Sequence, residues 1–143
     1  MAGIGGKEKI DILLVSYNRL NLLQITIKAI KKRTEYPYRL IVIDNGSDDG
    51  TIEWILNAYV NKKIDDIVLL GVNIGLGKAF QEGFKKVKSE YFITCTDDVI
   101  PPKVNPCWLT QELETIKNNP EYGGITMKGF RITKFSDLDE DLI

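Results

Sequence analysis

Histidine is absent from this chain, and cysteine is nearly so. Without an imidazole, Ser-His-Asp triads, Cys-His pairs and histidine metal ligands are all excluded, so acid–base chemistry must fall to carboxylates. The two cysteines, Cys95 and Cys107, are too few for a disulfide framework and fit a reducing compartment.

Long apolar runs and an excess of positive charge are also missing. No segment approaches the length of a membrane span, and residues 1–9 lack the apolar centre of a signal peptide. The 19 Lys and Arg against 20 Asp and Glu leave a net charge of −1, which does not favour nucleic acid as a partner. We therefore expect a protein with no transmembrane segment that is cytoplasmic or peripheral at the membrane.

Short apolar, β-branched runs alternate along the chain with segments of helical period. In a chain of 143 residues, enough for one domain with a core, this alternation predicts an α/β fold: a doubly wound, mostly parallel sheet with helices on both faces. We expect a domain over residues 10–128, a flexible tail over 1–9 and a C-terminal segment over 129–143. The expected strands are 10–15, 38–43, 64–70, 91–95 and 122–127, and the expected helices are 19–32, 51–59, 78–87 and 108–118.

The run from Tyr91 to Pro102 joins an apolar strand to a pair of carboxylates. Its first five residues are expected to form a strand buried on both faces, and the prolines at its end stop further pairing. Asp97 and Asp98 stand at the carboxyl end of this strand, where hard oxygen ligands suit a divalent cation that carries the phosphates of a nucleotide. A solvated Asp-Asp turn is the alternative interpretation.

Polar residues follow the other expected strands as well. The carboxyl ends of parallel strands share one edge of the sheet, so these segments should converge on one crevice. Convergence favours a polar, metal-capable nucleotide site over four independent loops. The segments are Ser16-Tyr17-Asn18, Asp44 to Asp49, Asn73 to Lys78 and Asp97-Asp98.

The glycines between Gly71 and Gly77 allow a different interpretation. Their spacing fits a dinucleotide-binding loop, and Tyr59 and Lys63 imitate the catalytic pair of a dehydrogenase. The order is wrong for that fold, because the loop follows the third expected strand and the Tyr/Lys pair precedes it. An NAD(P)-binding, dehydrogenase-like domain is therefore the less favoured alternative.

Taken in order, the four segments resemble the nucleotide-sugar-binding half of family-2 glycosyltransferases, which have the Rossmann-like GT-A fold. The resemblance covers about residues 10–128. Its motifs are Val15-Ser16-Tyr17-Asn18-Arg19, Asp44-Asn45-Gly46-Ser47-Asp48-Asp49-Gly50-Thr51 and Asn73-Ile74-Gly75-Leu76-Gly77-Lys78-Ala79. It implies inverting, metal-dependent transfer of a sugar from a UDP- or dTDP-linked donor to an unknown glycan, lipid or protein acceptor.

The resemblance also implies roles for individual residues. Asp44 would bind the base edge, Asp49 would lie near the ribose and phosphates, and Lys78 would face the pyrophosphate. Asp98 would ligate Mg²⁺ or Mn²⁺, although Thr96 stands where the family's metal motif has its first aspartate. The expected nucleotide-sugar-binding residues are Ser16, Tyr17, Asn18, Asp44, Asp49, Asn73, Gly75, Lys78 and Asp97.

A catalytic base is the part of the resemblance that this chain does not obviously supply. The late carboxylates are weak candidates, and we interpret them instead as a solvated acidic tail. The chain would then be an excised half, a minimal enzyme, or a subunit completed by another copy in a homo-oligomer. A nucleotide-sugar-binding module without turnover is the alternative function. These late carboxylates are Asp137, Asp139, Glu140 and Asp141.

Overall fold

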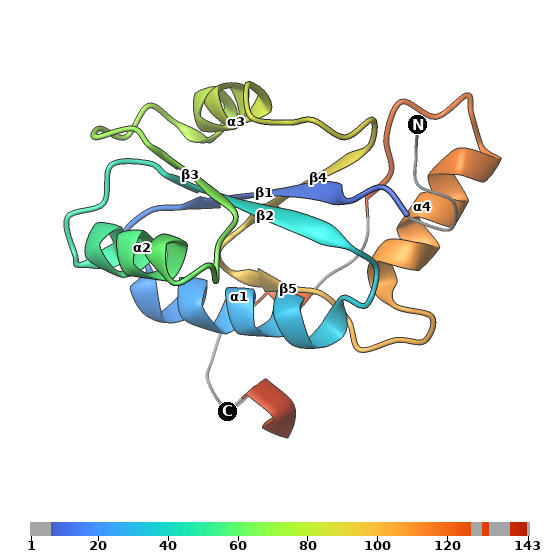
Figure 1. Cartoon of the computed structure of the whole chain (residues 1–143), viewed down its shortest axis with the longest axis horizontal. Helices are drawn as coiled ribbons and strands as arrows, with labels where there is room; N and C mark the ends of the chain where they lie inside the picture. Colours follow the sequence, from blue (N-terminus) through green and yellow to red (C-terminus); the bar gives the residue numbers. More distant parts are fainter. Residues whose placement is uncertain (1–6, 127–129, 132–137, 143) are drawn as a thin grey trace. The chain divides into compact units, whose positions relative to one another are not determined.

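The structure is a computed structural model that describes residues 7–126, 130–131 and 138–142 (Figure 1). The chain forms two compact units. The first contains the described residues up to Leu23 together with Pro37–Asp97, and the second contains Gln24–Tyr36 together with the described residues from Asp98 onward.

The first unit is built on a four-stranded parallel sheet in the order β3-β2-β1-β4. Its strands are β1 (Ile10–Ser16), β2 (Tyr38–Asp44), β3 (Asp66–Leu69) and β4 (Phe92–Thr96). The two central strands are apolar and almost wholly buried, as a parallel sheet covered on both faces requires.

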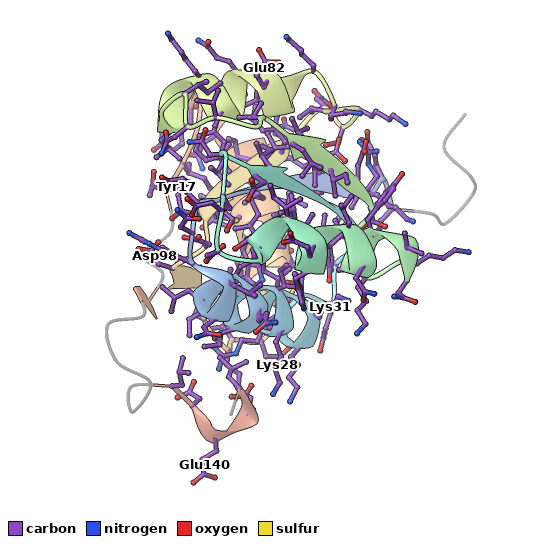
Figure 2. The ribbon with its side chains drawn as sticks, turned by 90° about the vertical axis from the view of Figure 1, so that its left-hand side faces the viewer. Tyr17, Lys28, Lys31, Glu82, Asp98 and Glu140 are labelled. Carbon is purple, nitrogen blue, oxygen red and sulfur yellow. The ribbon has the colours of Figure 1, made fainter. Side chains whose placement is uncertain are left out.

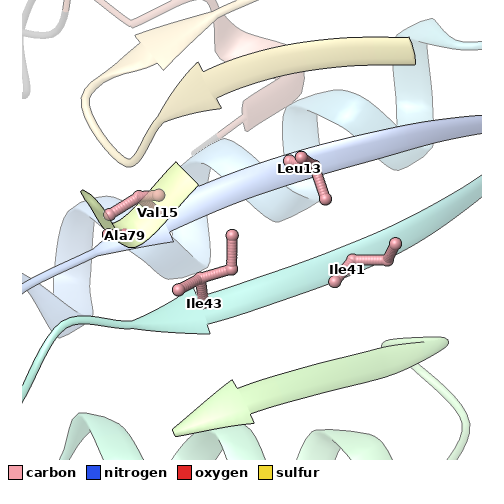
Figure 3. Close-up of a cluster of buried hydrophobic side chains, with 5 residues drawn as sticks. All are labelled: Leu13, Val15, Ile41, Ile43 and Ala79. Carbon is pink, nitrogen blue, oxygen red and sulfur yellow. The ribbon is translucent and has the colours of Figure 1, made fainter. Parts of the chain in front are cut away.

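Helices α2 (Thr51–Val60) and α3 (Leu76–Phe84) lie on opposite faces of this sheet (Figure 1). Apolar side chains of β1 and β2 pack with α3 to form the core cluster drawn in Figure 3. The partly buried Phe80 and Val87 pack against this cluster. The expected helices on both faces are therefore confirmed. The cluster comprises Leu13, Val15, Ile41, Ile43 and Ala79.

The second unit contains most of helix α1 (Leu20–Arg33), which begins in the first unit. It also contains a two-stranded antiparallel ladder of β5 (Val99–Ile100) and β6 (Phe130–Arg131), the helix α4 (Trp108–Asn118) and a 3₁₀ helix (Glu140–Leu142). Ala29, Ile100 and Leu142 form its apolar cluster. None of the helices in the described residues is both long enough and apolar enough to cross a membrane.

The structure corrects several details of the expected elements. The strand β4 is not buried on both faces, because it lies at the edge of the sheet and leaves Phe92 43% exposed. The strand expected over 122–127 is wrong for residues 122–126, where Gly123 and Gly124 interrupt the run, and Met127 lies outside the described residues. Other differences are a shorter third strand, a third helix that begins at Leu76 and ends at Phe84, and the unexpected strand β5.

Candidate functional site

The register of the parallel strands brings their carboxyl ends together in the first unit. Ser16 pairs with Asp44, Asp44 pairs with Leu69, and Val15 pairs with Thr96. Three loops therefore leave the same edge of the sheet, as we expected. We call residues 17–19 the first loop, residues 45–50 the second loop and residues 71–75 the glycine loop.

Asp44 ends β2 with a fully buried carboxylate. Its Oδ2 accepts hydrogen bonds from the backbone N–H groups of Gly46, at 3.1 Å, and Ser47, at 2.8 Å. Its Oδ1 is buried and has no hydrogen-bond partner in the described part of the chain. A buried acceptor without a donor costs roughly 1–3 kcal/mol, so an N–H group of a ligand placed here would recover this energy.

Asp97 ties the end of β4 to the first loop. Its Oδ2 accepts a hydrogen bond from the Ser16 hydroxyl at 2.9 Å and from the Tyr17 N–H at 3.4 Å. The Arg19 guanidinium lies 3.8 Å from Oδ1. The carboxylate is 4% exposed, whereas Tyr17, labelled in Figure 2, is 42% exposed at the surface.

Asn18 connects the first loop to the second. Its backbone N–H donates to the Ser47 hydroxyl at 2.9 Å, and its Oδ1 accepts the Asp48 N–H at 2.8 Å. The residue has φ = 49°, a left-handed conformation that asparagine tolerates better than most residues. The backbone N–H and the Oδ1 of Asn18 therefore both have partners within the protein.

Asn45 connects the second loop to the glycine loop. Its Nδ2 donates to Asn73 Oδ1 at 3.2 Å, and its Oδ1 accepts the Ile74 N–H at 3.0 Å. Asn73 Oδ1 also accepts the Gly75 N–H at 2.9 Å. Asn45 was not among the expected site residues, because an asparagine between Asp44 and Gly46 in a turn-rich motif indicates only a turn.

Asp49, Gly75 and Lys78 lie at the helices that follow these loops. Asp49 is exposed and accepts hydrogen bonds from the hydroxyl and the N–H of Thr51, the first residue of α2. The Thr51 hydroxyl is the main cause that holds the pKa of Asp49 below its usual value. Gly75 directly precedes α3, and Lys78 is exposed on the first turn of that helix.

The expected metal ligand, Asp98, belongs to the second unit and is 6% exposed. Across the described part of the chain, no group of three or more His, Cys, Asp or Glu side chains is placed to hold a metal ion. Asp98 can offer one carboxylate, so a cation here would need oxygens from a ligand. In the first unit, burial and the Asp97 carboxylate raise the pKa of the Cys95 thiol to about 12, which disfavours the nucleophilic thiolate.

The late carboxylates lie in the second unit. Arg33 NH2 is 2.8 Å from Asp139 Oδ2 and 3.0 Å from Asp141 Oδ1, so the interpretation of these two residues as a purely solvated tail is wrong. The Arg33 hydrogen bond holds the pKa of Asp141 below its usual value. Glu140 is exposed, and Asp137 lies outside the described residues.

Comparison with known proteins gives a consistent assignment. The family model described as Glycosyl transferase family 2 matches residues 11–139. The poly-beta-1,6-N-acetyl-D-glucosamine synthase of Staphylococcus epidermidis is 34% identical over 122 residues, which are 83% of this chain and 28% of that protein. The chain thus spans less than a third of the length of that relative.

Two solved structures have the same fold. A mannosyltransferase from Pyrobaculum calidifontis in complex with GDP-Man and Mn²⁺ has a TM-score of 0.66 at 18% identity, over 76% of this chain and 32% of that one. TarS 1–349 of Staphylococcus aureus in complex with UDP-GlcNAc has a TM-score of 0.64 at 21% identity, over 79% of this chain and 32% of that one. The expected GT-A fold is confirmed, and the dehydrogenase alternative is set aside. With the family model matched from residue 11 to residue 139, this chain belongs to glycosyltransferase family 2.

Proposed function

We propose that this chain binds the nucleoside diphosphate of a sugar donor at the edge formed by its three loops. The protein would then transfer the sugar, with inversion, to an acceptor. The observation that carries the proposal is the buried Oδ1 atom of Asp44, which has no hydrogen-bond donor among the residues that the structure describes. Membership of glycosyltransferase family 2 supports the same function.

The single unpaired oxygen of Asp44 favours a uracil or thymine base. Its Oδ2 is already occupied by two backbone N–H groups, so one acceptor atom remains. Uracil and thymine offer one N–H donor in the ring, cytosine and adenine offer an exocyclic NH₂ group and no ring N–H, and guanine offers a ring N–H beside an NH₂ group. A UDP- or dTDP-linked donor fits this arrangement, and the exposed ring of Tyr17 is available to stack on the base.

The diphosphate would lie against the glycine loop and the start of α3. A helix N-terminus attracts anions because its first N–H groups are unpaired and its dipole is positive there. Lys78 adds a positive charge on the first turn of α3. In this arrangement Asp44, Tyr17 and Lys78 contact the donor, while Ser16, Asn18, Asn73 and Asp97 hold the loops in place.

The chemistry of Asp98 fits a divalent cation, Mg²⁺ or Mn²⁺. Such ions are commonly held by one or two carboxylates together with phosphate oxygens, and Asp98 supplies one carboxylate. The Pyrobaculum calidifontis structure that shares this fold contains Mn²⁺ with its nucleotide sugar. When bound, the ion would supply electrostatic stabilisation for the departing diphosphate.

The first experiment is calorimetric titration of the chain with UDP, dTDP, GDP and CDP. We expect binding of UDP or dTDP that weakens at least about tenfold in Asp44→Asn, because the carboxamide removes the charge that strengthens the bond to the base. Asp48→Asn is the matched control, since Asp48 is an exposed aspartate of the same loop. Preferred binding of GDP, or equal losses in the two variants, would contradict the base assignment.

A second variant tests the metal ligand. We expect Asp98→Asn to abolish the increase in UDP affinity that Mn²⁺ produces and to leave the metal-free affinity unchanged. The measurement is the UDP titration of both proteins with and without Mn²⁺. An Asp98→Asn protein that retained the whole Mn²⁺ effect would remove Asp98 from the site.

A binding module without turnover is the second candidate function. It is favoured by one observation: the late carboxylates Asp139 and Asp141 are engaged with Arg33, whose hydrogen bond lowers the pKa of Asp141 and makes it a weaker base. We therefore assign no catalytic base to the described residues. Release of UDP from a UDP-sugar by this chain would favour catalysis, whereas tight binding without release would favour the module.

A further inference from the structure

Asn45 is a buried polar residue to which the proposed function gives no task. It is 4% exposed and directly follows β2. Its backbone N–H donates to the Ser16 carbonyl at 2.9 Å, which extends the pairing of β1 and β2 beyond the strands themselves. The position of Asn45 is therefore fixed by the sheet.

The side chain of Asn45 uses both ends of its amide on the glycine loop. The Nδ2 donates to Asn73 Oδ1, and the Oδ1 accepts the N–H of Ile74. Asn73 Oδ1 passes the connection on by accepting the N–H of Gly75, the residue that caps α3. A short chain of hydrogen bonds thus runs from the rigid sheet to the beginning of α3.

An amide is the chemical group that this position requires. The site needs one donor and one acceptor on the same planar group. Aspartate would keep the acceptor for the Ile74 N–H. Its second oxygen would replace Asn45 Nδ2, which lies 3.2 Å from Asn73 Oδ1, and would set a negative charge against that oxygen. Alanine would leave the Ile74 N–H and the side-chain Oδ1 of Asn73 without Asn45 as a partner.

We propose that Asn45 is a positioning residue that sets the glycine loop and the start of α3 for the diphosphate of the donor. This inference rests on the proposed function, because it assigns the diphosphate to the backbone that Asn45 holds. Asn45 itself would not touch the ligand. Its effect should therefore fall on the diphosphate part of the donor and not on the base, which Asp44 receives.

The test compares UDP with uridine, which has the base and lacks the phosphates. In titrations of the full chain, Asn45→Ala and Asn45→Asp should weaken UDP binding by about tenfold and change uridine binding by less than about twofold. Asn73→Ala should weaken UDP binding similarly, and the double variant should lose less than the sum of the two, because both residues belong to one network. Asn61→Ala is the matched control, since the amide of that exposed residue bonds to Asn57, away from the three loops.

The outcomes separate this inference from the proposed function. If the unaltered chain binds neither UDP nor uridine, both are overturned. If it binds UDP and the Asn45 variants lose UDP and uridine equally, the role of Asn45 is to support the fold and the inference is overturned, while Asp44→Asn still reports on the base. A lowered melting temperature alone would not produce the selective loss of UDP.

Discussion

Gly46 lies against the backbone of the glycine loop, next to Asn45 in the second loop. It has φ = 86°, a conformation that residues with a Cβ adopt only with strain. A Cβ placed there would lie 2.5 Å from the carbonyl carbon of Val72 and 2.7 Å from the nitrogen of Asn73. These are backbone atoms, so they cannot move aside as a flexible side chain can.

Gly46→Ala is therefore expected to destabilise the fold and to disturb the site. Left-handed strain costs about 1–2 kcal/mol, and the steric overlap adds roughly 1–3 kcal/mol. Gly50→Ala is the matched control, since Gly50 has φ = 95° in the same loop and open space around its Cβ position. Urea unfolding should give a larger loss for Gly46→Ala than for Gly50→Ala, and equal losses would mean that strain alone matters.

The sequence could predict which residues gather at the site but not which of them remain available to a ligand. The strand ends and turn residues were enough to bring Ser16, Asp44 and Asn73 together, because parallel strands share one edge. The hydrogen bonds that occupy Asn18, Asn73 and Asp97 depend on the register between loops, which no local pattern encodes. The unpaired oxygen of Asp44 became visible only with the structure.

At the scale of elements, residues 24–33 of α1 and residues 138–142 pack together within the second unit. Leu142 is buried in the same apolar cluster as Ala29. Lys32 donates to the Asp141 carbonyl at 2.6 Å, and Lys28, labelled in Figure 2, donates to the Leu142 carbonyl at 3.4 Å. Basic residues near the end of α1 thus bind the acidic segment of residues 138–142.

Removal of the two carboxylates that bind Arg33 should loosen this segment. We expect Asp139→Asn with Asp141→Asn to speed exchange of the Leu142 amide, which donates to the Asp139 carbonyl, by roughly threefold to tenfold. Glu140→Gln is the control, because Glu140 is exposed, as Figure 2 shows. Because the pKa of Asp141 is lowered, the contact should persist above its usual value of 3.8 and fail only as the pH falls through the lowered pKa. Equal exchange in the unaltered chain and the double variant, measured by NMR, would contradict the ion-pair role.

A helix or strand was predictable where its own residues carry an apolar run, a helical period or a proline that marks its end. Strands β1 and β2 have continuous apolar runs, and α4 begins and ends where its period and Pro120 indicate. The edge position of β4 could not be predicted, because strand order is decided by packing over the whole chain. Strand β5 has two residues, too few for any period.

At the scale of the whole first unit, the two ends of the sheet have different roles. The carboxyl ends of the strands carry the loops of the site, while the other end is fastened by Asp11 on β1. Asp11 Oδ1 accepts Arg39 Nε at 2.7 Å, and its Oδ2 accepts the N–H groups of Lys88, at 2.6 Å, and Ser89, at 3.1 Å. One buried carboxylate therefore joins β1, β2 and the segment between α3 and β4.

This arrangement makes the acid stability of the fold depend on Asp11. Burial alone would raise the pKa of Asp11, but the Arg39 guanidinium and the two backbone N–H groups outweigh burial and hold the pKa below 3.8. Since the folded pKa lies below the unfolded one, the stabilisation is complete above about pH 4 and is lost as the pH falls through the folded pKa.

Asp11→Asn should therefore lower the free energy of unfolding by roughly 2–3 kcal/mol at pH 7 and by clearly less at pH 3, because the unaltered chain has begun to lose the same interaction there. Urea unfolding of both proteins at the two pH values measures the difference. Glu82→Gln removes an exposed ion pair, 2.7 Å from Lys85, and should cost roughly 0.5 kcal/mol or less. If the Asp11→Asn difference were the same at both pH values, the ionised carboxylate would not be what fastens this end of the sheet.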